Sequence, residues 1–148
     1  MASIFKAYDI RGLYPSEINA EIVYKIGRAF VEHVSGKTIA LGRDMRESGE
    51  ELFDAFARGA GEAGADVVDL GVIETPMINF AVATGGYDGG AVITASHNAG
   101  KYNGIKFCKR GALPFPEIDA LEKRVAALGP AGSGRRGSVT KRDMTAEY

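Results

Sequence analysis

Apolar residues recur along the chain with two different spacings, and each spacing predicts one kind of secondary structure. Segments with apolar residues three and four positions apart predict helices over 20–34, between Ser48 and Gly64, over 75–83 and over 116–128. Short, mostly apolar runs predict strands over 5–10, 38–41, 66–70, 90–94 and 105–108. Because strands and helices alternate, we expect an α/β fold, a three-layer α/β/α arrangement around a mixed, largely parallel sheet.

The residues at the predicted helix starts agree with this assignment. Asn19 can cap the first helix, and Thr75 followed by Pro76 is typical of a cap and a first helical residue. Ser48, with Glu51 three positions later, has the spacing of a capping box. We therefore expect a side-chain cap at each of these three helix starts.

The composition of the chain changes after residue 128. Residues 129–138 are rich in glycine and serine and include the basic pair Arg135-Arg136, which is typical of a linker. From Val139 onward a mixed apolar and polar pattern resumes. The sequence therefore predicts one domain over 1–130, followed over 131–148 by a linker and the start of a further segment.

The overall composition is that of an ordinary globular chain. Its 148 residues are 45% hydrophobic and 25% charged, which suits one domain. A formal net charge of −1 gives no reason to expect binding to nucleic acid, and no apolar run approaches the roughly 20 residues that span a membrane. The first residues have no signal-peptide pattern, and the single cysteine, Cys108, has no internal disulfide partner. We expect a cytoplasmic protein in which Cys108 is a core residue.

Polar and charged residues gather where the predicted strands end. Functional residues of open α/β sheets collect at the carboxyl ends of strands. Guanidinium groups offer forked donors to phosphate oxygens and an ammonium group offers a point charge, so several of them near one hydroxyl predict a phosphate site. The clusters are Tyr8-Asp9-Arg11, Arg43-Asp44-Arg46, Ser96-His97-Asn98 and Lys106.

Other chemistry matches these residues less well. Ser96 and His97 are adjacent, and neighbouring side chains of an extended segment point to opposite sides, so they make a poor hydrolase pair. The first strand is not followed by the glycine-rich turn of a dinucleotide-binding fold, and there is no P-loop motif. Taken singly, Arg43 and Arg46 are typical surface charges and a serine at a strand end is typical of a turn. Only the combination indicates a phosphate site.

Three motifs, in order along the chain, resemble those of the α-D-phosphohexomutases. The segments 94–98 (TASHN) and 102–106 (YNGIK) resemble the active-site serine loop of that family. The segment 7–12 (AYDIRG) resembles the N-terminal motif of its phosphomannomutase/phosphoglucomutase branch, and 42–49 (GRDMRESG) resembles a third motif. The resemblance covers essentially the whole chain and implies the first of the family's four domains, with residues 131–148 leading toward the second.

The resemblance implies an isomerase that moves a phosphoryl group between O1 and O6 of a hexose phosphate. The reaction passes through a bisphosphorylated sugar, glucose or mannose 1,6-bisphosphate. Ser96 is then the phosphoserine, and Mg²⁺ binds to its phosphate. Magnesium prefers hard oxygen ligands, and a phosphate oxygen is one of them.

The resemblance also implies roles for the residues around Ser96. Arg11 and Lys106 match basic residues that assist proton transfer and hold the substrate, and His97 matches a residue that orients the sugar or its phosphate. The implied substrate contacts are Tyr8, Arg43, Arg46 and Asn98. An asparagine at position 98 can instead fix the loop through hydrogen bonds to the backbone.

The chain departs from the family pattern in two respects. Ala99-Gly100 replaces the usual proline after Asn98, which predicts a looser loop. The family's metal loop, sugar-selecting loop and C-terminal phosphate-binding loop do not occur in this sequence. We therefore expect the isolated chain to lack turnover, to need the remaining domains as partners and to self-associate through surface that those domains would cover.

Two alternative functions stay open. The first is a domain of a phosphoglucosamine mutase, against which 7–9 (AYD) argues, because that branch typically carries a Gly-Thr-Asp-Gly-type variant. The second is a non-catalytic module that binds phosphosugars or a partner protein.

Overall fold

The computed structural model describes residues 3–132, 134–144 and 147, and its centre is one mixed sheet of seven strands. Ser133 of the predicted linker and Tyr148 lie outside the described residues. The strands are arranged in the order β1-β5-β4-β2-β3-β7, with β6 paired to β5. Their bounds are β1 Ile10–Leu13, β2 Thr38–Arg43, β3 Asp66–Val72, β4 Gly89–Ile93, β5 Tyr102–Lys109, β6 Leu113–Pro114 and β7 Val139–Lys141.

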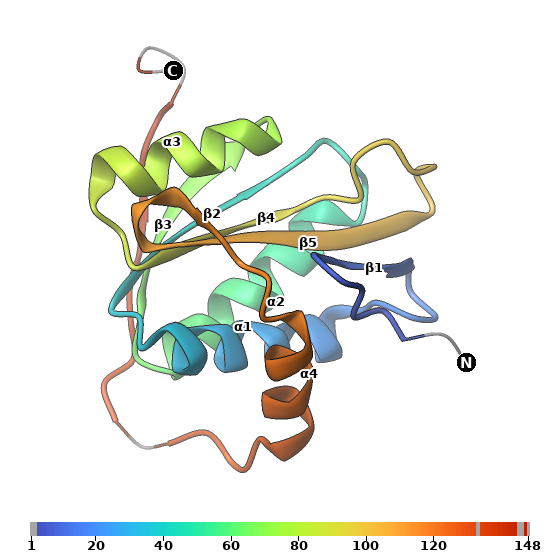
Figure 1. Cartoon of the computed structure of the whole chain (residues 1–148), viewed down its shortest axis with the longest axis horizontal. Coiled ribbons are helices and arrows are strands. Elements are labelled where there is room, and N and C mark those ends of the chain that lie inside the picture. Colours follow the sequence, from blue (N-terminus) through green and yellow to red (C-terminus); the bar gives the residue numbers. More distant parts are fainter. Residues whose placement is uncertain (1–2, 133, 145–146, 148) are drawn as a thin grey trace.

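Helices cover both faces of this sheet (Figure 1). They are α1 Ala20–Val34, α2 Gly49–Glu62, α3 Thr75–Gly85 and α4 Ile118–Ala127, and a short 3-10 turn, η1 Arg110–Ala112, follows β5. Helix α3 lies on one face, and α1, α2 and α4 lie on the other, which confirms the predicted α/β/α arrangement. None of the helices in the described part of the chain is both long and apolar enough to cross a membrane.

Each face of the sheet has its own apolar core. On the face of α1, α2 and α4, the ring of Phe30 lies 4.8 Å from that of Phe107, centroid to centroid. On the face of α3, Ile78 and Val82 belong to a smaller core that includes Cys108. Cys108 is thus the core residue that was predicted, and burial raises the pKa of its thiol to about 11. The thiol therefore stays protonated at neutral pH.

The register of the sheet brings the predicted clusters to one edge. Strand β2 is parallel to β3 and β4, whereas β5 is antiparallel to β4 and β1. Arg43, Ile93, Ile105 and Ile10 consequently lie in one row across four strands. A Cβ atom at Gly104 would lie 2.0 Å from the Ile10 carbonyl oxygen, so β1 can approach β5 this closely only because residue 104 is glycine. The loops that follow β2 and β4 therefore meet the segment that precedes β1.

The predicted helix caps are confirmed at α1 and wrong at α2 and α3. Asn19 accepts a backbone N–H from the first turn of α1 at 3.2 Å. Ser48 itself has helical angles (φ −73°, ψ −9°) and makes no capping bond. Its hydroxyl accepts a hydrogen bond from Asn103 at 2.7 Å, so a partner from β5 replaces the capping interaction. Thr75 is already helical, and Glu74 takes the N-cap position.

The first predicted strand, 5–10, is displaced along the chain. Strand β1 begins at Ile10 and continues through Arg11 and Gly12, while Phe5 makes only an isolated bridge to Ile10. Arg11 is compatible with a strand here because β1 lies at an edge of the sheet, where charged side chains are common. The backbone of Arg11 is therefore held by the sheet, while its guanidinium binds Asp9 in the segment before β1.

The segment after α4 returns to the sheet. Arg135 contacts Asp66 at 2.9 Å, and Val139–Lys141 then pair in parallel with β3 as β7. The described residues of 131–148 thus include a strand of this sheet, and the division of the chain at residue 130 stays a prediction.

Candidate functional site

The loop between β4 and β5, residues 94–101 and hereafter the serine loop, carries the predicted serine. Ser96, His97 and Asn98 are exposed, whereas β4 is buried along its whole length. Ser96 has a φ of 57°, in the left-handed region. This conformation costs a residue other than glycine roughly 1–2 kcal/mol and persists only where the surrounding contacts impose it.

Hydrogen bonds within the serine loop close its two turns. The backbone N–H and the side-chain amide of Asn98 both donate to the Ala95 carbonyl oxygen, at 3.1 and 3.0 Å. The Tyr102 N–H donates to the Ala99 carbonyl oxygen at 2.9 Å. The side chain of Asn98 therefore binds the loop backbone, which was one of the two roles expected for it; the other was contact with the substrate.

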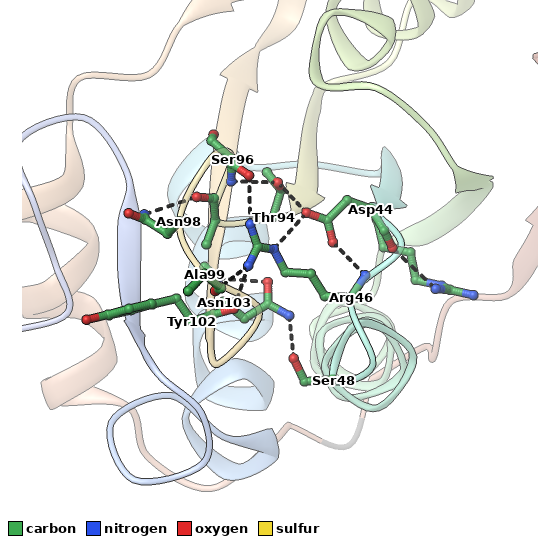
Figure 2. Close-up of polar contacts among 12 residues, drawn as sticks. Asp44, Arg46, Ser48, Thr94, Ser96, Asn98, Ala99, Tyr102 and Asn103 are labelled. Carbon is green, nitrogen blue, oxygen red and sulfur yellow. Dashed lines mark hydrogen bonds and ion pairs between the residues drawn. The ribbon is translucent and has the colours of Figure 1, made fainter.

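Arg46 extends from the loop after β2 to the underside of the serine loop (Figure 2). Its Nη1 donates to the carbonyl oxygens of Ala99 and Tyr102 at 2.7 and 3.2 Å, and its Nη2 donates to the carbonyl oxygen of Ser96 at 2.7 Å. Its Nε donates to Asp44 at 3.0 Å, and its side chain is 11% exposed. The guanidinium is therefore bonded to the protein on each of its nitrogens.

Asp44 and Thr94 connect Arg46 back to Ser96. The buried hydroxyl of Thr94 donates to Asp44 Oδ2 at 2.7 Å and accepts the Ser96 backbone N–H at 2.9 Å. The other oxygen of Asp44 accepts the Arg46 backbone N–H at 3.2 Å. Ser96 is thus tied through both its N–H and its carbonyl group to Arg46, Asp44 and Thr94, hereafter the Arg46 circuit.

A buried polar pair anchors the start of β5. The side-chain amide of Asn103 donates to Ser48 Oγ at 2.7 Å, and its Oδ1 accepts the Gly104 N–H at 2.9 Å. Asn103 is fully buried, and buried polar groups of this kind are almost always hydrogen bonded. The pair fixes the strand that carries Lys106 relative to the start of α2.

A hollow of about 490 Å³ lies between the serine loop and the segment before β1. Here Asp9 accepts Arg11 Nε at 3.1 Å and Lys106 Nζ at 3.2 Å. The Asp9 side chain is 10% exposed, but those of Arg11 and Lys106 are 43% and 34% exposed. Lys6 also lines the hollow, so three cations and one carboxylate leave a formal charge of +2 beside the serine loop. We call this space the cationic hollow.

A second hollow, of about 1090 Å³, lies between the serine loop and the start of α3. Ser96 and His97 line both hollows. Met45 and Val72 contribute exposed apolar surface to the second one. Ser96 therefore lies on the rim between a cationic and a partly apolar space.

The structure brings most of the predicted site residues together. Arg46 lies beneath the serine loop, where its donors bind the protein backbone and Asp44, and it also lines the second hollow. Arg43 makes a separate contact, from its Nη1 to the Asp44 carbonyl oxygen at 3.4 Å. The predicted residues that line the cationic hollow are Tyr8, Arg11, Ser96, His97, Asn98 and Lys106.

Sequence reasoning gave no role to four residues of this site: Asp9, Asp44, Thr94 and Asn103. The signal for the two acids was present, because Asp9 and Asp44 each lie within two residues of an arginine in the predicted clusters. Thr94 and Asn103 carried no such signal, since their partners lie 50 and 55 residues away.

Comparisons with known proteins agree with the motifs. Residues 2–132 match the family model described as phosphoglucomutase/phosphomannomutase, alpha/beta/alpha domain I. The chain is 42% identical to a phosphomannomutase of Salmonella typhimurium, over 97% of this chain and 33% of that protein. It is 40% identical to a phosphoglucomutase of Neisseria meningitidis, over 98% of this chain and 32% of that protein.

A solved structure gives the same result for the fold. A phosphoglucomutase/phosphomannomutase family protein from Burkholderia thailandensis matches with a TM-score of 0.87 at 40% identity, covering 100% of this chain and 35% of that one. The chain therefore spans about a third of the length of each of these relatives.

Proposed function

The chain belongs to the phosphoglucomutase/phosphomannomutase family, as its α/β/α domain I, and on this premise we propose that Ser96 carries the phosphoryl group in an isomerase of hexose phosphates. The relatives are named phosphomannomutase or phosphoglucomutase, which are isomerase-type enzymes, and this chain corresponds to one domain of them. The observation that carries the proposal is the position of Ser96, exposed on the rim of the cationic hollow.

The proposed reaction begins with a phosphate on Ser96. The bond from phosphorus to Ser96 Oγ breaks as a bond to a free hydroxyl of the hexose phosphate forms, and the hydroxyl proton passes to a base. The product is glucose or mannose 1,6-bisphosphate. In the second step the bond from its other phosphorus to the sugar oxygen breaks as the bond to Ser96 Oγ forms again, and the sugar oxygen takes up a proton as the serine hydroxyl loses one. Positioning and neutralisation of charge supply most of the catalysis in such transfers.

The cationic hollow suits this chemistry. We propose that Arg11 and Lys106 hold the transferring phosphate and assist the proton transfer, while Asp9 keeps the two cations close together. Arg11 offers a forked donor and Lys106 a point charge, and both are partly exposed. Tyr8 and His97 line the same hollow and would contact the sugar or its phosphate. Arg43 would add positive charge at longer range.

Magnesium follows from the resemblance, but the described residues do not form a complete site for it. No group of three or more His, Cys, Asp or Glu side chains among them is placed to hold a metal ion. Mg²⁺ requires octahedral oxygen coordination, which one serine hydroxyl does not provide. We propose only that a phosphate on Ser96 offers one oxygen ligand, with the others supplied by the part of the longer relatives that this chain does not match.

A domain exchange tests the proposal. This chain would replace the matching third of the Salmonella typhimurium phosphomannomutase, and the chimera would be assayed for conversion of mannose 1-phosphate into mannose 6-phosphate with mannose 1,6-bisphosphate present. Ser96→Ala should lower turnover about 10³-fold or more, because the group that accepts the phosphate is lost. The matched control is Ser35→Ala, since Ser35 also has a left-handed φ, of 52°, but lies at the end of α1.

The outcomes separate the possible functions. Turnover that survives Ser96→Ala would rule out the phosphoserine, whereas a phosphate located on Ser96 by mass spectrometry would support it. A folded chimera that binds mannose 1-phosphate without converting it would favour a binding module. Conversion of glucosamine phosphates alone would favour the phosphoglucosamine branch. The isolated chain should show no turnover.

A further inference from the structure

A closed path of hydrogen bonds begins and ends on Ser96 (Figure 2). The Ser96 N–H donates to the Thr94 hydroxyl at 2.9 Å, and this hydroxyl donates to Asp44 at 2.7 Å. Asp44 accepts Arg46 Nε at 3.0 Å, and Arg46 Nη2 returns to the Ser96 carbonyl oxygen at 2.7 Å. The path therefore holds both peptide groups that flank the Cα atom of Ser96, which sets its φ of 57° and the direction of its side chain.

Arg46 has little capacity left to bind a phosphate. A guanidinium group has five N–H donors. Arg46 makes four hydrogen bonds with them, one to Asp44 and three to carbonyl oxygens of residues 96–102. Its side chain is 11% exposed, and its charge faces that of Asp44. A phosphate at Ser96 would instead meet Lys106 and Arg11, which are three to four times more exposed.

The serine loop needs support of this kind at its tip. Ala99-Gly100 stands where the family pattern has a proline, and glycine leaves the chain more freedom than proline does. Arg46 Nη1 binds the Ala99 carbonyl oxygen, which precedes Gly100, and the Tyr102 carbonyl oxygen, which follows it, at 2.7 and 3.2 Å. One rigid guanidinium thus spans the part of the loop that lacks the proline.

We infer that Arg46 is a positioning residue for phosphoryl transfer, which acts through the backbone of the serine loop and does not touch the substrate. The inference rests on the proposed role of Ser96 and deepens it. Misplacement of a reacting group by about 1 Å can lower a rate about 10²-fold. Loss of the Arg46 circuit should therefore reduce turnover and leave substrate binding intact.

The first test measures hydrogen exchange of the serine-loop amides in this chain, without the rest of the chimera. Arg46→Lys keeps the positive charge but loses the fork that spans the carbonyl groups. Hydrogen exchange of the Ser96, Asn98 and Tyr102 amides, followed by NMR, should become about tenfold faster or more, while the amides of β2 and β3 keep their rates. Arg135→Lys is the matched control, because Arg135 also binds a backbone carbonyl and a carboxylate, those of Gly64 and Asp66.

The second test measures the reaction in the chimera. Arg46→Lys should lower kcat about 10- to 100-fold and leave KM for mannose 1-phosphate within about twofold. Thr94→Val removes one hydroxyl from the path, so it should also lower kcat and leave KM nearly unchanged. A guanidinium that binds substrate phosphate would give the opposite pattern, with a raised KM.

Unchanged exchange in Arg46→Lys would overturn the inference, as would a raised KM with an unchanged kcat. If the wild-type chimera is inactive, the proposed function fails, and the exchange rates alone then decide whether Arg46 fixes the serine loop. If Arg46→Lys does not fold, Thr94→Val carries the same two measurements, because valine preserves the shape of the side chain.

Discussion

Two sets of cationic side chains lie beside Ser96, Arg46 alone and the pair Arg11 and Lys106. The two sets differ in how many N–H donors are still free to bind a ligand. Arg46 is 11% exposed and makes four hydrogen bonds to the protein. Arg11 and Lys106 are 43% and 34% exposed and share one carboxylate, that of Asp9. With their acids counted, the first set is formally neutral and the second carries one positive charge. We therefore expect free donors, and not distance from Ser96, to determine which of these cations bind phosphate.

The two sets should also differ in what they contribute to stability. Removing the Arg46 side chain would leave the charge of Asp44 without its cationic partner and three carbonyl groups without this donor, and such losses cost more than the loss of an exposed ion pair. The ion pairs of Asp9 with Arg11 and Lys106 are partly exposed, and pairs of this kind contribute about 0–1 kcal/mol. Substitutions in the first set should act on folding, and those in the second on ligand binding.

The largest expected effect is on the stability of Arg46→Ala. We expect the free energy of unfolding to fall by about 2–4 kcal/mol. For a domain of this size the melting temperature would fall by about 5–12 °C, measured by circular dichroism. Arg135→Ala is the control, since the Arg135 side chain is 65% exposed, and this variant should melt within about 3 °C of the wild type. Equal losses in the two variants would remove the contrast between the sets.

A smaller effect is expected on phosphate binding by Lys106→Ala. A hydrogen bond to a charged group contributes about 1.5–3 kcal/mol, so the affinity for inorganic phosphate should fall about 10- to 150-fold, measured by NMR titration. Asp9 keeps Arg11 as a partner, so the melting temperature should change by less than about 3 °C. Lys101→Ala is the control, because Lys101 is an exposed lysine of the serine loop that does not line the cationic hollow. A loss of affinity in Lys101→Ala as large as in Lys106→Ala would contradict the assignment.

The acids of the two sets, Asp9 and Asp44, should differ in how their replacement changes the affinity for phosphate, and the expected change is smaller than that for Lys106→Ala. Asp9→Asn removes the only carboxylate that faces Arg11 and Lys106 in the cationic hollow as described, so phosphate should bind about threefold more tightly at low salt. Asp44→Asn should not tighten binding, because the donors of Arg46 are held by carbonyl oxygens. Phosphate titrations of both variants at two salt concentrations would measure this. Equal tightening in the two would mean that Arg46 also faces the ligand.

Local patterns in the sequence predicted the parts of the fold that depend on neighbouring residues. The spacing of apolar residues located α1 over Ala20–Val34, and Asn19 caps it, because helix periodicity and capping act within one turn. The motifs placed Ser96 and Lys106 near each other through resemblance. Both line the cationic hollow in the structure.

The remaining parts depend on partners far away in the sequence. Ser48 has the spacing of a capping box with Glu51, but Asn103, 55 residues away, takes its hydroxyl. Arg43 and Arg46 look equivalent in the sequence, yet only Arg46 extends to the serine loop, because the turn after β2 sets their directions differently. No pattern within a single segment distinguishes such pairs.

The smallest expected effect comes from restoring the proline of the family pattern, as Ala99→Pro. Proline at a compatible site stabilises by about 0.4–1 kcal/mol, chiefly by restricting the unfolded chain. Positive φ values outside glycine occur at Ser35, Ser96 and Ala112 in the described residues, so Ala99 is not in the left-handed region. Its carbonyl oxygen, which Arg46 binds, is retained by proline. We therefore expect a rise in melting temperature of about 1–4 °C.

The informative measurement is the same substitution combined with Arg46→Lys. If Arg46 already restrains the tip of the serine loop, the proline should slow hydrogen exchange of the loop amides little in the wild type and more in Arg46→Lys. Residues that share one restraint are not additive, and a double-mutant cycle measures the difference. Additive effects would mean that Arg46 and residue 99 restrain different parts of the loop. In that case the contrast between the two cationic sets would rest on exposure alone.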